Sequence, residues 1–343
     1  MGNDFLLATI LGRLSAGENL SQSEAADLFQ QVVQGRCSPG ELGLLLTALR
    51  SKGETADEIA GAASALRQQM IPIRSERTGL LDTCGTGGDG SSTFNISTAA
   101  ALVTAAAGVP VAKHGNRKVT SRSGSADVLT ALGVNVEASV ATVEACLAEL
   151  GLCFCFAPLL HPAMKQVSDV RRALGGRTIF NLLGPLTNPA NAPYRLLGVG
   201  QASFRPLLAD ALAKLGVRRA LVVHGADGLD EVTVCAETLV TEVAADGTRR
   251  EFRWTPADFG VDRADPAALA VEGPEASAAV IRAVLANQPG AARDITLINA
   301  AAALLTAGAA ADLPSAMSRC AEALASGAAA DLLARLAARS QAR

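Results

Sequence analysis

Residues 80–98, LLDTCGTGGDGSSTFNIST, contain a short apolar run, then a glycine-rich loop, then the first turn of a predicted helix. The loop carries four glycines around one aspartate, and Ser97 and Thr98 precede an apolar run at 99–107. Glycine lets the backbone approach a ligand closely, and the start of a helix supplies unpaired N–H groups with a partial positive charge. The stretch therefore predicts a strand, a phosphate-binding loop and a helix in succession.

Other nucleotide-binding loops fit this stretch less well. The spacing Gly85-x-Gly87-x-x-Gly90 matches the dinucleotide pattern, but that pattern also needs an acidic residue about 20 positions later. Residues 106–113, AAGVPVAK, contain no carboxylate. A P-loop needs Gly-Lys followed by Ser or Thr, which the loop lacks. A flexible glycine turn without a ligand remains an alternative. An anion site is favoured by the hydroxyl and amide side chains that follow, at Thr93, Asn95, Ser97 and Thr98.

The first 70 residues predict helices. Three pairs have the capping-box spacing, in which a hydroxyl residue and the glutamate three positions later satisfy each other's free N–H groups: Ser21–Glu24, Ser38–Glu41 and Thr55–Glu58. Each pair opens an apolar segment with helical spacing. We therefore expect a four-helix domain over residues 1–72.

From about residue 73 short apolar runs alternate with helical segments. The predicted strands lie at 80–85, 109–115, 152–156, 196–200 and 219–225, and the predicted helices at 97–107, 125–132, 141–150, 204–215, 276–287, 294–307 and 314–326. Such alternation indicates an α/β domain over 73–343, with a mostly parallel central sheet flanked by helices. Ligands bind such sheets beyond the carboxyl ends of the strands. The final ARSQAR, residues 338–343, is expected to be frayed.

A second loop, residues 113–125 (KHGNRKVTSRSGS), is strongly basic. It holds four cations among serines, at Lys113, Arg117, Lys118 and Arg122, with no carboxylate before Asp127. A solvated basic turn is the alternative, but a loop that follows a strand end beside the first loop indicates a second phosphate cradle.

Residues 222–232, VVHGADGLDEV, form an acidic turn after a predicted strand. Asp227, Asp230 and Glu231 would repel a phosphorylated ligand unless a hard cation came between them. Mg²⁺ held by one or two carboxylates and by ligand phosphates resolves that conflict. An exposed acidic turn remains the alternative.

Residues 161–190, HPAMKQVSDVRRALGGRTIFNLLGPLTNPA, predict a basic helix followed by a rigid turn with two prolines. Arg171 and Arg172 point about 100° apart on a helix, so only one faces a given site. One of them could bind a carboxylate ligand as a bidentate pair, and a structural salt bridge is equally compatible. The three histidines, His114, His161 and His224, match no metal motif and are interpreted as contact or hydrogen-bonding residues.

The composition limits the classes of function. A net charge of −3 gives no general attraction to nucleic acid or to an anionic membrane. Seven cysteines without a paired CxxC spacing indicate free thiols in a reducing cytoplasm. The first residues lack a basic signal-peptide region, and the apolar stretch 300–311 is too short to span a bilayer. We expect a soluble cytoplasmic protein that binds neither nucleic acid nor membrane.

Four motifs in this order, DTCGTGGDG–STFNIST, KHGNR–SRSGSADVL, HPAMK–VRR–GRTIFNLLGPLTNP and VHGADGLDE, closely resemble the anthranilate phosphoribosyltransferase family over essentially the whole chain. The resemblance implies a pentosyltransferase of tryptophan biosynthesis, which moves phosphoribose from phosphoribosyl pyrophosphate to the amine of anthranilate with Mg²⁺. It also implies a homodimer joined through the helical domain, to which a segment at about 168–192 contributes.

The resemblance assigns site residues by matching position. The pyrophosphate and ribose would be held by Gly85, Gly88, Asp89, Thr93, Asn95, Ile96, Ser97, Thr98, Lys113, His114, Gly115, Asn116, Arg117, Lys118, Val119, Thr120, Ser121 and Ser125. Two Mg²⁺ ions are expected per site, one touching Ser97 and the other held by Asp230 and Glu231. Anthranilate would contact Asn116 and Arg171, with Gly85 at the junction and His114, His161 and Pro185 along the channel. Lys113 and Arg117 would stabilise the leaving anion electrostatically, and no general base is assigned.

The chain departs from the family pattern at Lys118, Gly176 and Leu159–Leu160, which affects local rigidity and the channel rather than the reaction. Two other functions are alternatives. A pyrimidine nucleoside phosphorylase usually carries a further C-terminal domain and would not need Asn116, Arg171 and the NLLGPLTNP tract. A non-enzymatic relative that binds nucleic acid would lack the Asp230–Glu231 pair and carry a basic surface.

Overall fold

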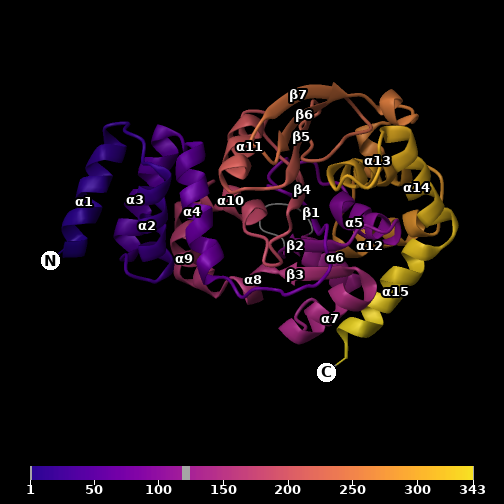
Figure 1. Cartoon of the computed structure of the whole chain (residues 1–343), viewed down its shortest axis with the longest axis horizontal. Helices are drawn as coiled ribbons and strands as arrows, with labels where there is room; N and C mark the ends of the chain where they lie inside the picture. Colours follow the sequence, from indigo (N-terminus) through magenta and orange to yellow (C-terminus); the bar gives the residue numbers. More distant parts are fainter. Residues whose placement is uncertain (1, 118–123, 343) are drawn as a thin grey trace.

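Capping boxes begin three of the four N-terminal helices, as the sequence predicted. The computed structural model describes residues 2–117 and 124–342. Its first helices are α1 (Gly2–Ser15), α2 (Gln22–Val33), α3 (Pro39–Lys52) and α4 (Ala56–Gln69). At the start of α2, α3 and α4 the capping hydroxyl accepts the backbone N–H of the glutamate three positions on, and that carboxylate accepts the N–H of the capping residue. These helices form the bundle at the left of Figure 1.

The sheet lies to the right of this bundle (Figure 1). In the described ranges it has seven strands, in the order β3-β2-β1-β4-β5-β6-β7. The strands are β1 (Leu81–Gly85), β2 (Val111–Gly115), β3 (Leu152–Phe156), β4 (Tyr194–Gly198), β5 (Arg219–Gly225), β6 (Thr238–Ala244) and β7 (Arg249–Trp254). Neighbours from β3 to β5 run parallel, and β6 and β7 run antiparallel. The predicted mostly parallel sheet is therefore confirmed.

The antiparallel hairpin of β6 and β7 was not predicted. Its turn contains Asp246-Gly247, a dipeptide that favours tight hairpin turns. Gly247 adopts a φ of 81°, and its N–H donates to the carbonyl of Ala244 at 3.0 Å. This turn signal, flanked by residues that suit strands, was available in the sequence.

Helices cover both faces of the sheet. On the side of the N-terminal bundle, α11 (Phe204–Lys214) packs on β5, β6 and α4. The other face is covered by α5 (Ile96–Ala106), α6 (Ser125–Ala131), α7 (Val140–Leu150), α12 (Pro274–Leu285), α13 (Ala291–Thr306), α14 (Leu313–Ala325) and α15 (Ala328–Ser340). Residues 338–340 were expected to be frayed, but they end α15, and the buried Ser340 hydroxyl accepts the N–H of Asn135 at 2.9 Å. The alanine-rich run before them continues the helix.

Short helical segments connect β3 to β4 across the face that carries the site. They are α8 (Ala157–Leu160), η1 (Pro162–Met164), α9 (Lys165–Leu174), α10 (Phe180–Leu183) and η2 (Gly184–Leu186), and two further 3₁₀ turns, η3 (Pro256–Phe259) and η4 (Pro266–Leu269), follow β7. Val167, Phe180 and Leu183 are buried in the same apolar cluster as α1–α4 and α11. The N-terminal helices thus share one continuous core with this connection and with one face of the sheet.

No helix in the described part of the chain combines the length and the apolar content that a bilayer crossing requires.

At Gly61, α4 packs closely against α2. A Cβ atom placed there would lie 2.3 Å from the carbonyl oxygen of Gln22 and 2.7 Å from the Cβ of Ala25. Replacing a helical glycine by alanine normally stabilises a helix by about 1 kcal/mol. At Gly61 the added methyl group would push α2 and α4 apart, so the substitution destabilises the protein instead of stabilising it.

We predict that Gly61→Ala lowers the free energy of unfolding by roughly 1–3 kcal/mol, the usual cost of overpacking. Gly43→Ala in α3 is the matched control, because its Cβ would meet only Val170 Cγ1 at 3.9 Å. Thermal unfolding of both variants measures the difference. Equal or higher stability of Gly61→Ala would contradict the close packing.

Candidate active site

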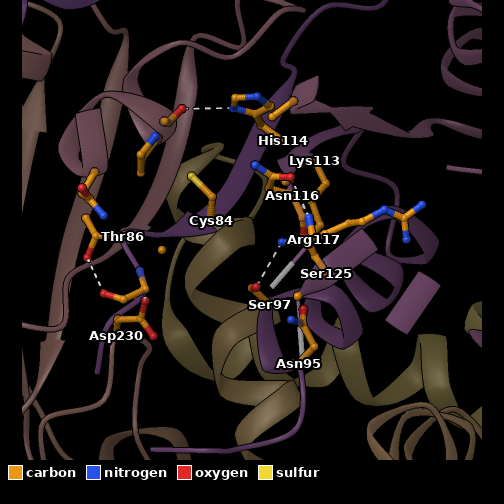
Figure 2. A pocket seen from close by; sticks show the side chains of 18 of the residues that line it. Cys84, Thr86, Asn95, Ser97, Lys113, His114, Asn116, Arg117, Ser125 and Asp230 are labelled. Carbon is orange, nitrogen blue, oxygen red and sulfur yellow. Dashed lines mark hydrogen bonds between the residues drawn. The ribbon is translucent and has the colours of Figure 1, made fainter. Parts of the chain in front are cut away.

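A cavity of about 550 Å³ opens where β1 and β2 end. Its walls come from the loop after β1, the start of α5, the end of β2, the 157–187 connection and the turn after β5 (Figure 2). Segments that are distant in the sequence therefore meet at the carboxyl edge of the parallel strands, where ligands of such sheets bind.

Most of the predicted binding residues of the described part of the chain line this cavity. They are Gly85, Asp89, Thr93, Asn95, Ile96, Ser97, Lys113, His114, Gly115, Asn116, Arg117, Ser125, His161, Arg171, Pro185, Asp230 and Glu231. Gly88 and Thr98 are not part of its lining, and the buried Thr98 donates its hydroxyl to Oδ1 of Asn95. Lys118, Val119, Thr120 and Ser121 lie outside the described residues.

The glycine-rich loop leads directly into the start of α5. Gly87, Gly88 and Gly90 have φ values of 66°, 78° and 71°, which side chains disfavour. Asn95 is the N-cap of α5, but its side chain accepts no backbone N–H of the first turn. The backbone N–H of Ser97 points instead to Oε1 of Glu231, at 3.1 Å. The start of α5 therefore faces an anionic group, as its partial charge favours.

Two glycines on neighbouring strands make room for Asp230. Gly85 of β1 pairs with Gly198 of β4. A Cβ atom on Gly85 would lie 2.3 Å from Oδ2 of Asp230, and one on Gly198 would lie 1.6 Å from its carbonyl oxygen. The backbone N–H of Gly87 donates to the same Oδ2 at 2.8 Å. Gly198 was not singled out in the sequence, because Asp230 is 32 residues further along the chain (230 − 198).

Asp230 and Glu231 are buried carboxylates that destabilise each other's charged form. Burial raises the pKa of both groups, and the neighbouring Asp89 and Asp230 raise the pKa of Asp230 and Glu231 respectively. The Lys113 cation acts in the opposite direction on the pKa of Glu231. Lys113 therefore compensates only part of the negative charge of Asp230 and Glu231, and a further cation would stabilise their ionised forms.

Lys113 lies in β2, within the predicted strand 109–115, which overlaps the predicted basic loop 113–125. Its side chain is 3% exposed, and its Nζ donates to the Thr83 carbonyl at 2.7 Å and to the Ser97 hydroxyl at 3.0 Å. Figure 2 shows Lys113 and Ser97 directed toward one another. The apolar residues before it continue the strand, so the lysine enters the sheet interior and joins β2 to the start of α5.

Asp227 has a structural role, unlike Asp230 and Glu231. Its carboxylate accepts the Thr233 hydroxyl at 2.7 Å and the Leu229 N–H at 3.3 Å. These contacts hold the turn after β5, and Asp227 is not part of the cavity lining.

Arg117 directs its guanidinium to carboxylates. It pairs with Asp127 at 3.4 Å and with Glu137 at 2.8 Å, and it lies over the Phe156 ring at 5.5 Å from the centroid. The basic loop has no carboxylate before Asp127 in the sequence, but Asp127 itself and Glu137, which follows α6, both pair with Arg117. Arg117 lines the cavity with part of its side chain while its charge is largely compensated.

Two histidines meet at the other end of the cavity. The Nε2 atoms of His114 and His161 are 3.1 Å apart, and Nδ1 of His114 is 3.0 Å from the Gly184 carbonyl. A carbonyl only accepts, so His114 carries its proton on Nδ1 and accepts at Nε2 from His161. Burial lowers the pKa of His114 to about 4 and that of His161 to about 3. Both rings are therefore neutral hydrogen-bonding residues at pH 7.

Arg171 faces the cavity, whereas Arg172 faces solvent and pairs with Asp169 at 3.1 Å. The expectation that only one of the two arginines faces the site is confirmed. The Arg171 guanidinium lies over the Phe180 ring, 5.5 Å from its centroid, and burial lowers its pKa. A half-buried cation beside an aromatic ring suits a planar carboxylate ligand.

Sequence reasoning missed several lining residues. On α9, Lys165 and Ser168 share the cavity face with Arg171, at helical spacing. That spacing would have identified them once Arg171 was chosen. Asn181 and Thr187 also line the cavity, but their sequence gives no comparable signal.

The described residues contain no group of three or more His, Cys, Asp or Glu side chains arranged to hold a metal ion. A cation at Asp230 and Glu231 would thus need further oxygen ligands from a substrate.

Comparison with known proteins covers both parts of the chain. Residues 8–70 match the model of the glycosyl transferase family, helical bundle domain, and residues 77–330 match that of the glycosyl transferase family, a/b domain. The chain is 53% identical to the anthranilate phosphoribosyltransferase of Anaeromyxobacter dehalogenans (strain 2CP-C), over 91% of this chain and 92% of the relative.

Solved structures agree. The crystal structure of anthranilate phosphoribosyltransferase from Thermus thermophilus matches with a TM-score of 0.91 and 44% identity, covering 97% of this chain and 99% of that one. The Saccharomyces cerevisiae anthranilate phosphoribosyltransferase in complex with PRPP and Mg matches with a TM-score of 0.89 and 28% identity, covering 97% of each chain. These matches, which span the helical and the α/β domain, show that the chain belongs to the anthranilate phosphoribosyltransferase family of glycosyl transferases.

Proposed function

We propose that this protein transfers the phosphoribosyl group of phosphoribosyl pyrophosphate (PRPP) to the amine of anthranilate. The products are N-(5-phosphoribosyl)anthranilate and pyrophosphate, in the biosynthesis of L-tryptophan. One observation carries the proposal: a single cavity joins buried carboxylates and a glycine loop to a cation stacked on an aromatic ring. The first set suits a metal-bound diphosphate and the second a planar aromatic carboxylate.

The PRPP end is assigned to the loop after β1, the start of α5 and the end of β2. Gly85, Gly88, Asp89, Thr93 and residues 95–98 are proposed to hold the pyrophosphate and ribose. Residues 113–121 and Ser125 are proposed to complete the phosphoribosyl site. Free N–H groups at a helix start and in a glycine loop stabilise phosphate oxygens, which supports this assignment. The assigned cations are Lys113, which is buried beside Ser97, and Arg117.

Mg²⁺ fits the residues present. Asp230 and Glu231 are hard oxygen donors whose pKa values are raised by burial and by neighbouring carboxylates, so added positive charge is favourable there. The S. cerevisiae relative was solved with PRPP and Mg bound. We propose two ions per site, one held by Asp230 and Glu231 and one touching Ser97. When bound, they would neutralise charge that develops on the leaving pyrophosphate.

The end of the cavity that would bind anthranilate, the acceptor end, is assigned to Arg171, Asn116 and the residues around Pro185 and the histidine pair. Arg171 is proposed to bind the carboxylate of anthranilate, with Gly85 at the junction. Pro185, His114 and His161 would contact the aromatic ring of anthranilate. Anthranilate's amine is uncharged and nucleophilic at neutral pH, and the two histidines are already bonded to each other. We therefore propose that positioning carries the reaction, with no essential general base.

Three broader features also stay proposals. The chain is proposed to divide into a helical domain, 1–72 with about 168–192, and an α/β domain, 73–343. The separate family models for residues 8–70 and 77–330 support this division, and the burial of Phe180 in one cluster with α1–α4 supports the packing of 168–192 on the helical domain. A homodimer through the helical domain is proposed, and the 63% exposed Leu44 on α3 gives that face an apolar contact. Location in the cytoplasm remains a prediction.

The proposed reaction is tested by direct turnover. We predict that purified protein consumes anthranilate, seen as loss of its fluorescence, only when PRPP and Mg²⁺ are both present. Chelation of Mg²⁺ should stop consumption, and mass spectrometry should detect the phosphoribosyl adduct. Uridine with inorganic phosphate is the control pair; turnover of that pair without consumption of anthranilate would contradict the proposal in favour of a nucleoside phosphorylase.

Stability as a function of pH tests the carboxylate pair without any substrate. Burial raises the folded-state pKa to about 7 for Asp230 and about 8 for Glu231, above the ordinary carboxyl value of about 4. The folded protein therefore binds more protons than the unfolded chain between these limits. Its stability falls as pH rises through that window and levels off above it.

We predict that the metal-free Asp230→Asn/Glu231→Gln variant gains melting temperature relative to wild type when the pH rises from 5 to 8. Calorimetry at both pH values measures the change. Asp246→Asn removes an exposed carboxylate and is the control, because its shift should be the same at both pH values. Parallel curves for the double variant and wild type would contradict the raised pKa values.

A further inference from the structure

The turn that closes the acceptor end is held by donors from three separate elements. Three consecutive carbonyls in η2 each accept one of these donors. Gly184 accepts from His114 of β2 at 3.0 Å. Pro185 accepts from Nη1 of Arg195 of β4 at 2.8 Å, and Leu186 accepts from Nε of Arg67 of α4 at 2.8 Å. Each carbonyl is therefore tied to a different part of the fold.

The two arginines donate from behind the turn and are not themselves part of the cavity lining. Arg195 is 1% exposed, and its only nearby carboxylate in the described ranges is Asp82, at 3.6 Å. Asp82 also accepts the backbone N–H of His114 at 3.0 Å. Arg67 has no carboxylate partner in the described part of the chain, and burial followed by the Arg195 charge lowers its pKa to about 9. Arg67 thus remains charged at neutral pH.

The turn also has contacts of its own. The Thr187 hydroxyl donates to the carbonyls of Leu183 at 3.1 Å and Gly184 at 3.2 Å, and Leu183 and Leu186 are buried in the apolar core. Prolines at 185 and 189 remove backbone donors, and η2 is only three residues long. Leu183, Gly184, Pro185 and Thr187 nevertheless form one wall of the cavity, beside Arg171 and Phe180. A shift of this wall would change the width of the acceptor end without moving the carboxylate end, which is built on other elements.

We propose that Arg67 and Arg195 are positioning residues for the acceptor substrate, which act by fixing the 184–187 turn through its carbonyls. Arg67 belongs to the helical bundle and Arg195 to the sheet, so the acceptor end takes its shape from both. This inference rests on the proposed function, because it assigns the acceptor end to anthranilate. Charge-assisted hydrogen bonds to carbonyls are strong enough to hold a turn in one position.

Arg67→Met is the main test, since it keeps the length and packing of the side chain and removes the donor. We expect the KM for anthranilate to rise about tenfold, as loss of one charge-assisted hydrogen bond allows, while the KM for PRPP stays within about twofold. Arg67→Lys keeps a charged donor and should recover part of the loss. Arg195→Met should act in the same direction as Arg67→Met and covers the case of a poorly folded Arg67 variant.

Arg219→Met is the matched control. Arg219 also donates to a carbonyl, that of Leu305 at 2.6 Å, but Leu305 lies outside the 184–187 turn and is not part of the cavity lining. Arg219→Met should lower the melting temperature without changing the KM for anthranilate. If Arg67→Met changes only stability, or raises both KM values equally, the positioning role is wrong. A wild-type protein that does not consume anthranilate overturns the proposed function, and this inference with it.

Discussion

The close contact between Asp230 and the glycine pair of β1 and β4 is the constraint on which the site depends. Gly85 and Gly198 sit side by side in the sheet, and neither can carry a Cβ without striking Asp230. Asp230 and Glu231 are thereby brought under the glycine loop and against the start of α5. The fold accepts two buried carboxylates whose charge Lys113 offsets only in part. A structure of this kind favours its cation-bound and ligand-bound state over the empty one.

The cavity has two ends with opposite chemistry. Acidic oxygens and helix N–H groups lie at the carboxyl edge of β1 and β5, and in Figure 2 His114 lies well apart from Asp230 and Asn95. The other end is made by the 157–187 connection, which packs on the N-terminal bundle. A reaction that joins a metal-bound diphosphate sugar to an aromatic amine needs this separation, because each substrate must be held by its own charges until the reacting atoms meet.

Local signals in the sequence were sufficient for the elements that begin the site. The capping boxes and the strand–loop–helix pattern of 80–98 depend on neighbouring residues, and all are confirmed. Contacts between segments that are distant in the sequence could not be predicted from such local signals. The partner of Gly198, the pairing of Arg117 with Glu137 and the donors from Arg67 and Arg195 depend on which segments the topology brings together. Lys113 belonged both to the predicted strand 109–115 and to the predicted loop 113–125, because a charged residue at the end of an apolar run suits either until its partners are known.

The central claim is that the two ends of the cavity bind different substrates, and steady-state kinetics of two variants in one assay test it most directly. Arg171→Ala should raise the KM for anthranilate by about tenfold or more, the cost of losing a charge-assisted pair, and leave the Mg²⁺ concentration for half-maximal rate unchanged. Asp230→Asn/Glu231→Gln should raise that Mg²⁺ concentration and leave the KM for anthranilate unchanged. If each variant shifts both quantities together, the separation of the two ends is contradicted.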